Sequence, residues 1–310
     1  MSIHYLILGA GGTGGSLAAF LAAGGKHVEV IARGEHLRAI QDHGLTLERL
    51  RRGAFTVPVK ASGMEHYTGS PDVIFLCVKS YSLEDFIPFL ERVCRPETVV
   101  IPILNVFGTG GMLQERLPEP LVTDGCIYIV ARIKEPGTIL LESEIFRVVF
   151  GVRRPEEYRP VLAEVARDLQ ECGVQGEVSE NIRRDALQKF SFVSPMAACG
   201  LYYGAAAGAM QRPGRERETF LALVREIRDL ARAMGITFLV DLERTNLDIL
   251  DALEPQSTTS LQRDIGAGHP SEVDGLIFRV VRLGRELGVG TPWYSRVAEK
   301  FGFSSEEAER

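Results

Sequence analysis

The feature that most constrains the fold of this chain is a glycine-rich turn close to its start. An apolar run at residues 5–8 leads into the turn, a helix-like stretch follows at 16–23, and a second apolar run comes next at 28–32. A strand, turn, helix and strand in this order form the β-α-β unit that binds dinucleotides, and the G-x-G-x-x-G spacing suits its turn. The residues predicted to bind the dinucleotide are Gly9, Ala10, Gly11, Gly12, Thr13 and Gly14.

Each motif glycine has a physical reason in such a unit. Gly9 permits the tight turn, Gly11 lets the backbone approach a pyrophosphate, and Gly14 lets the helix pack against the strand. The helix N-terminus then offers free N–H groups and a partial positive charge to the phosphates. The alternative is a glycine-rich loop that binds no ligand.

A basic residue, Arg33, follows the second apolar run. An NAD site usually has Asp or Glu about twenty residues past the last glycine, where it binds the ribose hydroxyls. A guanidinium in that place suits a 2′-phosphate, because it can make paired, charge-assisted hydrogen bonds. Arg33 therefore predicts NADPH rather than NADH, and the alternative is a solvated surface arginine.

Short apolar runs alternate with helix-like stretches through the first half of the chain. Continuous apolar strands separated by helices indicate a parallel sheet covered on both faces. The later runs lie closer together, and Glu135-Pro136-Gly137 has the composition of a turn, which predicts hairpins on the sheet edge. The runs are 5–8, 28–32, 73–78, 98–104, 121–131, 138–141 and 148–152.

Helical periodicity dominates the second half. Residues 156–172 predict an amphipathic helix that stops at Gly173, and two later apolar stripes stop at Gly235 and Gly288. We therefore predict an α/β domain at 1–178 and a mainly helical domain at 179–310. The apolar helices leave the oligomeric state open, since they could pack within their own domain or against a second copy in a homodimer.

Composition narrows the classes of function. Lys and Arg number 35 against 41 Asp and Glu, a net charge of −6, so the chain lacks the basic field of nucleic-acid-binding proteins. No apolar run reaches the roughly 18 residues of a membrane helix, which predicts no membrane partner. Five scattered cysteines without a C-x-x-C pair fit a reducing cytoplasm. The six histidines are not at metal-ligand spacing, and no metal is predicted.

Polar residues follow two more of the apolar runs. Lys79 comes directly after residues 73–78, and Asn105 comes directly after the next run. Ligands of open parallel sheets bind at the carboxyl ends of the strands. We therefore expect Gly9, Arg33, Lys79 and Asn105 to face one crevice, although Lys79 or Asn105 alone could be an ordinary loop residue.

Lys189 is the charged member of an otherwise apolar helical stripe. Such a lysine either extends to solvent from the edge of a buried face or points into a cleft. An ammonium in a cleft can polarise a carbonyl and protonate the alkoxide that forms as a hydride arrives. Pro195 either kinks this helix or begins a new one. The apolar members of the stripe are Ile182, Ala186, Val193 and Ala197.

Together these motifs resemble those of the ketopantoate reductase (2-dehydropantoate 2-reductase) family, and the resemblance spans most of the chain. The second half adds residues 181–190, which include Lys189, and a spacing of Ser260, Asp264 and Glu272 that is similar to the C-terminal signature of the family. The other matching elements are residues 9–14, Ile31-Ala32-Arg33, Val78-Lys79, Asn105, Pro136-Gly137, Ser260-Leu261-Gln262-Arg263-Asp264 and Ser271-Glu272-Val273-Asp274.

The resemblance implies a Rossmann-type N-terminal domain that binds NADP and a helical C-terminal domain for substrate binding and catalysis, with the active site between them. It implies reduction of a 2-oxo acid by NADPH, as in pantothenate biosynthesis. On this chain Lys189 would donate the proton, and Asn105 would touch both nicotinamide and substrate. Lys79 and Glu272 would lie at the cofactor, and Ser260 would bind substrate together with Lys189.

Two residues at the C-terminal signature have a simpler alternative. Ser271 could be a helix N-cap with Glu272 in the first turn, where an acidic residue is favourable in any case. Ser260 could likewise be an ordinary loop or capping serine.

Two departures from the family pattern concern the substrate. The family has Asn-Gly where this chain has Asn105-Val106-Phe107-Gly108. It also has asparagines where this chain has Val193 and Ala197, which should weaken recognition of a hydroxylated substrate. The alternatives are a two-domain dehydrogenase with another carbonyl or imino substrate, and a non-catalytic NADPH-binding regulator.

Overall fold

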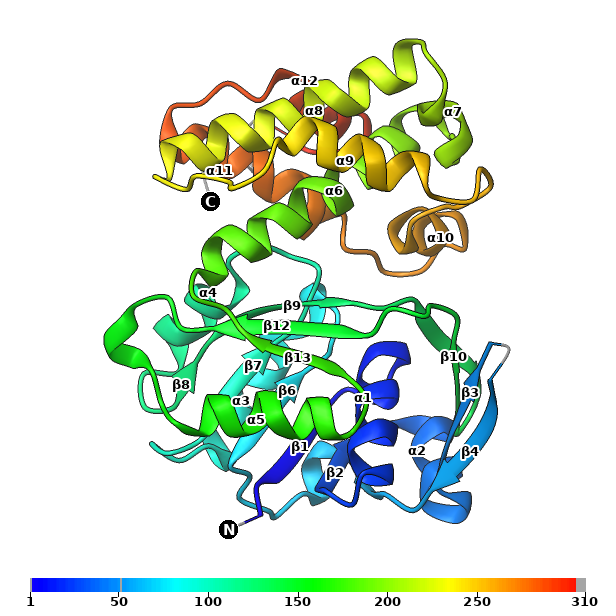
Figure 1. The fold of residues 1–310 in the computed structure, drawn as a ribbon, viewed down its shortest axis with the longest axis vertical. Helices are drawn as coiled ribbons and strands as arrows, with labels where there is room; N and C mark the ends of the chain where they lie inside the picture. Colours follow the sequence, from blue (N-terminus) through cyan, green and yellow to red (C-terminus); the bar gives the residue numbers. More distant parts are fainter. Residues whose placement is uncertain (1, 51, 305–310) are drawn as a thin grey trace. The chain divides into compact units, whose positions relative to one another are not determined.

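The computed structural model describes residues 2–50 and 52–304, and the chain divides into two compact units. The first comprises Met1–Leu104 and Gly108–Asp185, and the second comprises Asn105–Phe107 and Ala186–Arg310. Figure 1 shows strands and helices in the first unit, while the described part of the second is helical. None of the helices in the described ranges combines the length and apolar character that a membrane span requires.

The first unit is built on a six-stranded parallel sheet, which confirms the predicted α/β class. Its strand order is β5-β2-β1-β6-β7-β8. This is the order of the doubly wound dinucleotide-binding fold, in which the winding direction reverses beside β1. The strands are β1 (His4–Leu8), β2 (His27–Ile31), β5 (Lys60–Ser62), β6 (Val73–Leu76), β7 (Val99–Pro102) and β8 (Leu121–Val122).

Helices cover both faces of this sheet (Figure 1). Tyr5 and Ile7 enter one apolar core while Leu6 and Leu8 enter another, because successive side chains of a strand point to opposite faces. Burial on both sides explains why these strands are continuously apolar. The first core includes α1 (Gly12–Ala23), α2 (Gly34–His43) and α5 (Val161–Glu171), and the second includes α3 (Leu83–Val93) and α4 (Thr109–Arg116).

The prediction that the later apolar runs form hairpins on the edge of this sheet is wrong. A hairpin does turn at Gly137, where φ is +80°, but it belongs to a second sheet of order β10-β11-β3-β4. A third sheet has the order β13-β12-β9. Apolar runs mark strands locally, whereas strand partners depend on segments far away in the chain. These strands are β3 (Leu45–Arg49), β4 (Gly53–Val57), β9 (Asp124–Tyr128), β10 (Ala131–Glu135), β11 (Thr138–Leu141), β12 (Arg147–Gly151) and β13 (Gln175–Val178).

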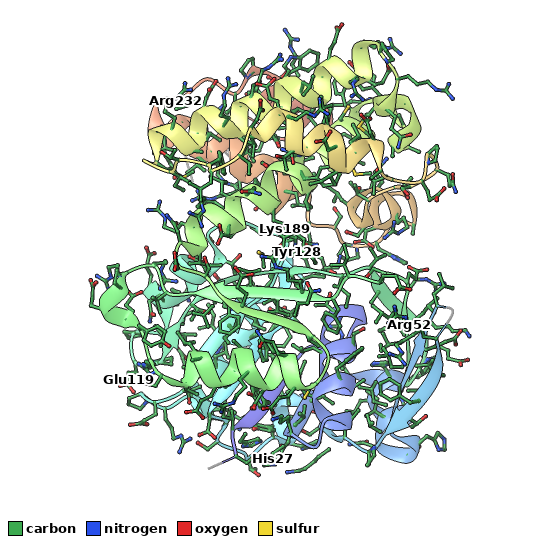
Figure 2. All side chains as sticks on the ribbon, viewed as in Figure 1. His27, Arg52, Glu119, Tyr128, Lys189 and Arg232 are labelled. Carbon is green, nitrogen blue, oxygen red and sulfur yellow. The ribbon has the colours of Figure 1, made fainter. Side chains whose placement is uncertain are left out.

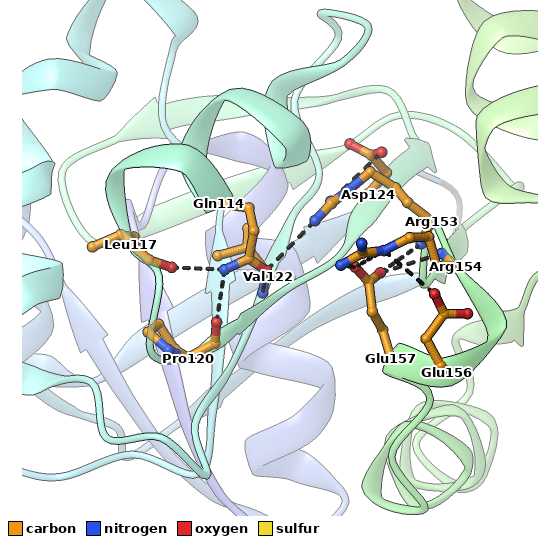
Figure 3. A network of polar contacts seen from close by, with 9 residues as sticks. All are labelled: Gln114, Leu117, Pro120, Val122, Asp124, Arg153, Arg154, Glu156 and Glu157. Carbon is orange, nitrogen blue, oxygen red and sulfur yellow. Dashed lines mark hydrogen bonds and ion pairs between the residues drawn. The ribbon is translucent and has the colours of Figure 1, made fainter.

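A polar network fastens α4 to the strand that follows it (Figure 3). The amide nitrogen of Gln114 donates to the carbonyl oxygens of Leu117 (2.7 Å) and Pro120 (3.0 Å), and its oxygen accepts from the backbone N–H of Val122 (2.9 Å). The Gln114 side chain thus hydrogen-bonds backbone groups at the end of α4, in the following loop and in β8. These three bonds hold the end of α4 in place beside β8.

The other end of α4 is held by Asp124. Its Oδ1 accepts from the backbone N–H of Gly110 at 2.9 Å, and its Oδ2 lies 3.7 Å from Nη1 of Arg153. Burial raises the pKa of the Asp124 carboxyl, while Arg153 and the Gly110 N–H oppose that rise. A carboxylate at this place suits the positive end of a helix dipole. The first turn of α4 is therefore anchored directly after residues 105–108.

The second unit is a helical assembly around its own apolar core. The stripes predicted before Gly235 and Gly288 are confirmed, and both glycines have positive φ where the helices stop. The helices are α6 (Ile182–Tyr203), α7 (Ala207–Gln211), α8 (Arg215–Ala233), α9 (Leu242–Asp251), α10 (Ser260–Gly266), a π-helical segment (Asp274–Phe278), α11 (Arg279–Leu287) and α12 (Pro292–Lys300). Short 3-10 turns in the first unit are η1 (Met64–His66), η2 (Ser80–Ser82) and η3 (Pro155–Glu157).

Helix α6 continues through Pro195 rather than ending there. A proline has no N–H, so it leaves the carbonyl of Ser191 without its usual helical donor. The buried Asn246 of α9 supplies one, because its Nδ2 donates to the Ser191 carbonyl at 3.2 Å and to the Ser191 hydroxyl at 3.0 Å. The long helix that carries Lys189 is thereby tied to the core of the second unit.

Candidate active site

The glycine-rich turn joins β1 to α1, and the fold requires glycine at Gly12, where a Cβ would lie 2.3 Å from the carbonyl oxygen of Ala131, as well as at Gly9 and Gly14. Gly9 has φ +99°, and the N–H groups of Gly9 and Ala10 both lie 3.2 Å from the carbonyl oxygen of Ile31. A Cβ on Gly14 would lie 2.1 Å from the carbonyl oxygen of Gly9 and 2.9 Å from Cγ2 of Ile7. These three glycines therefore serve the fold whether or not a ligand binds.

Gly11 is different, because a Cβ there would meet no heavy atom within 4 Å. It is the N-cap of α1 and has an extended backbone (φ −70°, ψ −167°). The first N–H groups of a helix lack helical partners and favour anions. The open space beside Gly11 and the free end of α1 fit the phosphates of a dinucleotide, and packing against the protein gives no reason for glycine here.

Arg33 and Lys79 follow the two strands that flank β1. Arg33 is exposed and is the N-cap residue of α2, two residues after the end of β2, while Lys79 is half-buried and precedes η2 after β6. The carboxyl ends of parallel neighbours meet at one edge of a sheet. The structure therefore brings the glycine turn, Arg33 and Lys79 to the same edge of the six-stranded sheet.

His36 supports this edge and was not found by sequence reasoning. Its Nδ1 accepts from the N–H of Gly137 at 3.0 Å, so its Nε2, 2.8 Å from the carbonyl oxygen of Ala10, carries the proton and donates. Burial lowers the pKa of His36, which favours this neutral form. The imidazole thus links the glycine turn to the β10–β11 hairpin, and one histidine in a helix carries no sequence signal for such a role.

Asn105 lies in a segment that clusters with the second unit, although it follows β7 in the chain. The ring of Phe107 packs 6.2 Å from that of Phe190 on α6, which attaches this segment to the helical core. Gly108 has φ +81° and caps α4. The glycine that directly follows asparagine in the family pattern is thus displaced to position 108, and two residues with side chains stand before it.

Lys189, which is labelled in Figure 2, lies on α6 and contacts Asn105. Its Nζ donates to the Oδ1 of Asn105 at 2.7 Å, and the lysine is half-buried. An amide oxygen orients an ammonium group without cancelling its charge. The structure therefore brings together two predicted site residues that are far apart in the chain, and the lysine is held by a polar partner.

The face of α6 beyond Lys189 is apolar. Val193, one turn further along, is half-buried, and Ala197 is fully buried. Neither side chain has a polar atom, so this part of the helix cannot hydrogen-bond a substrate through either position.

Ser260 and Glu272 lie on other elements of the second unit. Ser260 is the first residue of α10, but the N-cap is Thr259, whose hydroxyl accepts from the N–H of Gln262 at 3.2 Å. Glu272 is only 4% exposed and precedes the π-helical segment. The capping alternative for Ser260 is thus wrong, because Thr259 fills that place.

Comparison with known proteins relates most of the chain to one group of oxidoreductases. Residues 5–155 match the family model described as ketopantoate reductase PanE/ApbA, and residues 181–303 match the model of its C-terminal part. A 2-dehydropantoate 2-reductase of Mesorhizobium japonicum is 27% identical over 313 residues, covering 92% of this chain and 93% of that protein.

Solved structures share the fold at low sequence identity. The crystal structure of 2-dehydropantoate 2-reductase from Methylococcus capsulatus has a TM-score of 0.86 and 22% identity, and the match covers 99% of this chain and 98% of that one. The ternary structure of D-mandelate dehydrogenase with NADH and anilino(oxo)acetate has a TM-score of 0.85 and 19% identity, covering 95% and 96%.

Proposed function

Because this chain belongs to the ketopantoate reductase family of oxidoreductases, we propose that it reduces a 2-oxo acid to the 2-hydroxy acid with NADPH, and that Lys189 donates the proton. The observation that carries this proposal is the 2.7 Å hydrogen bond from Lys189 to Asn105. This bond supports a Lys189 ammonium that is held in a fixed orientation rather than extended into solvent.

The residues present fit a nicotinamide dinucleotide. The open space beside Gly11 at the start of α1 suits the pyrophosphate, and Arg33 and Lys79 add positive charge at the same sheet edge. When bound, the nicotinamide supplies the hydride. The structure of a neighbour, D-mandelate dehydrogenase, contains NADH, which supports a nicotinamide dinucleotide as the cofactor. The proposed preference for NADPH over NADH rests on Arg33 alone.

The chemical role proposed for the chain's own residues follows from charge. Negative charge builds on the substrate carbonyl oxygen during reduction, and an ammonium stabilises it and then protonates it. Asn105 orients that ammonium through its amide oxygen. Ser260 is proposed to bind substrate and Glu272 to contact the cofactor. Five scattered cysteines without a C-x-x-C pair support a reducing compartment such as the cytoplasm.

Replacing Arg33 tests the choice of cofactor. Arg33→Ala is expected to weaken NADPH binding by about tenfold to a hundredfold and to leave NADH binding almost unchanged, because a charge-assisted contact to the 2′-phosphate is worth about 1.5–3 kcal/mol. Fluorescence titration of both dinucleotides measures the difference. Arg38→Ala, an exposed arginine of the same helix α2, is the matched control. Equal losses for NADPH and NADH would contradict a 2′-phosphate contact.

A substrate panel tests the reaction itself. We expect NADPH oxidation with 2-oxo acids that have apolar side chains and slower oxidation with 2-dehydropantoate, because Val193 and Ala197 cannot hydrogen-bond its hydroxyl. Mandelate is a 2-hydroxy acid with an apolar ring, and its dehydrogenase shares the fold. Matched acids with and without the hydroxyl, followed by NADPH absorbance, give the ratio of kcat/KM.

The other results of the panel have clear meanings. Fast turnover of 2-dehydropantoate would restore the substrate named by most relatives. NADPH binding with no turnover on any 2-oxo acid would contradict the proposed reaction. It would favour another carbonyl or imino substrate, or a regulator that only binds NADPH.

A further inference from the structure

Two histidines meet at the amino-terminal ends of β1 and β2, at the opposite end of β1 from the glycine turn. His4 and His27 are direct partners in the parallel pairing, so their side chains lie on one face of the sheet. Their rings stack with centroids 4.1 Å apart and planes at 11° (His27 is labelled in Figure 2). The proposed reductase function uses neither residue.

A buried carboxylate lies against this pair. Glu29 follows His27 by two residues and therefore points to the same face of β2. Its Oε1 is 3.6 Å from Nε2 of His4 and 3.9 Å from Nε2 of His27, and one ligand atom from each residue lies within 4.8 Å of the others. The Glu29 side chain is only 7% exposed.

Two buried atoms of this cluster have no hydrogen-bond partner among the described residues: Nε2 of His4 and Oε2 of Glu29. Nε2 of His4 faces Oε1 of Glu29 across 3.6 Å, which is longer than a hydrogen bond. In the neutral tautomer that leaves Nε2 without a proton, two acceptors face each other there, and a cation between them would satisfy both.

Lys60 offsets part of the negative charge of Glu29 through one of its two carboxylate oxygens. Its Nζ lies 2.9 Å from Oε1 of Glu29, and its side chain is 72% exposed. Within residues 2–50 and 52–304, Oε2 of Glu29 and Nε2 of His4 have no hydrogen-bond partner. A flexible, solvated lysine can leave Oε1 at little cost when a more strongly bound cation arrives.

We propose that His4, His27 and Glu29 bind one divalent transition-metal ion, and that Zn²⁺ is the ion that suits them. Two imidazoles and one carboxylate are donors that suit zinc, whereas Mg²⁺ and Ca²⁺ prefer oxygen donors alone. Zinc bonds of about 2.0–2.1 Å in tetrahedral geometry separate donors by roughly 3.4 Å. The two carboxylate–imidazole distances, 3.6 and 3.9 Å, exceed this value by only a few tenths of an ångström, and all three ligand atoms lie within 4.8 Å of one another.

His27 is the ligand whose side chain would move on metal binding. Its side chain is 57% exposed, so its ring can tilt out of the stack and direct Nε2 at the ion while His4 and Glu29 stay in place. Water would complete the coordination, as in three-ligand zinc sites. The ion would bridge two neighbouring strands and stabilise the first unit, since a ligand that binds only the folded state raises its stability.

Metal titration of the intact, untagged chain tests this site. After EDTA treatment and dialysis, Co²⁺ is expected to give the visible absorption of a tetrahedral site with one ion per chain, and Zn²⁺ should displace it and raise the Tm. His27→Ala and Glu29→Gln should each weaken Zn²⁺ binding by about tenfold or more and abolish the rise in Tm.

The matched control is His66→Ala. His66 also lies 3.7 Å from a carboxylate, that of Glu65, but both side chains are exposed and no second histidine of the described part of the chain clusters with them. This variant should bind Zn²⁺ as the unchanged protein does. His27 is exposed, so His27→Ala should fold, and its Tm without metal checks this. Equal Zn²⁺ affinity in His27→Ala and the unchanged chain, or no saturable binding below roughly 100 μM, would overturn the proposal and leave an ion-pair cluster with Lys60.

Discussion

Lys189→Ala is expected to slow reduction of the best 2-oxo acid by about 10²–10⁴-fold, which corresponds to roughly 3–5 kcal/mol of transition-state stabilisation. The proposed role of Lys189 is to stabilise and protonate the developing alkoxide. Removing it takes away both effects, and the other lysine of the second unit, Lys300, donates instead to the carbonyl oxygen of Tyr202. The measurement is kcat and KM for the 2-oxo acid with saturating NADPH.

Dinucleotide binding separates this role from a structural one. The affinity of Lys189→Ala for NADPH should stay within a factor of about three, because binding energy that acts only in the transition state does not appear in the ground state. Lys300→Ala, in which a lysine of the same unit loses its bond to the Tyr202 carbonyl, is the matched control and should keep normal turnover. Near-normal turnover of Lys189→Ala would reject the proton-donor assignment.

Asn105→Ala extends the same test. Asn105 is expected to act largely through Lys189, so the double variant should be little slower than Lys189→Ala alone. Strictly additive losses would mean that Asn105 and Lys189 act independently. A smaller loss for Asn105→Asp than for Asn105→Ala would indicate that an acceptor for the ammonium is what matters.

The second large effect is expected from two glycine variants that the structure separates. Gly11→Ala should unfold at nearly the same Tm as the unchanged chain, because its φ and ψ suit alanine and its Cβ meets no atom within 4 Å. It should nevertheless bind NADPH about tenfold or more weakly, since the methyl group occupies space at the pyrophosphate.

Gly14→Ala should instead have its main effect on thermal stability. Its Cβ would lie 2.1 Å from the carbonyl oxygen of Gly9 and 2.9 Å from Cβ of Cys77, which only a shift of α1 away from β1 can relieve. Overpacking of this kind costs about 1–3 kcal/mol or more, so the Tm should fall by several degrees. Thermal unfolding and NADPH titration of both variants measure the contrast. Unchanged NADPH affinity in Gly11→Ala would indicate a glycine turn that binds no dinucleotide.

Local sequence signals predicted much of the fold. Apolar runs, helical stripes and stop glycines depend on residues that are neighbours in the chain, so β1, β2, β6 and β7 were found, as were the ends of α8 and α11. The helix predicted over 156–172 is shorter, because η3 precedes α5. The short, partly exposed strands β3, β4, β5 and β13 were missed, since they lack a continuous apolar run.

The sequence likewise predicted some features of the candidate site and not others. The residues of the glycine turn, Arg33 and Lys79 could be predicted because each follows a strand whose neighbours are set by the doubly wound order. Asn105 was predicted in the same way because it follows β7, but the sequence alone could not predict that residues 105–107 belong to the second unit, since the altered turn to Gly108 removed the family pattern. The placement of Asn105 depends on the packing of Phe107 against Phe190 and on the bond to Lys189.

What the sequence by itself determined is therefore the α/β class, the dinucleotide-type turn and the helical second half, all of which rest on local periodicity and on backbone demands for glycine. Tertiary structure alone decided the partners of β10 and β11, the link from His36 to Ala10, and the meeting of His4, His27 and Glu29. These depend on contacts between distant segments. Their free energy comes from packing and burial, which no spacing along the chain records.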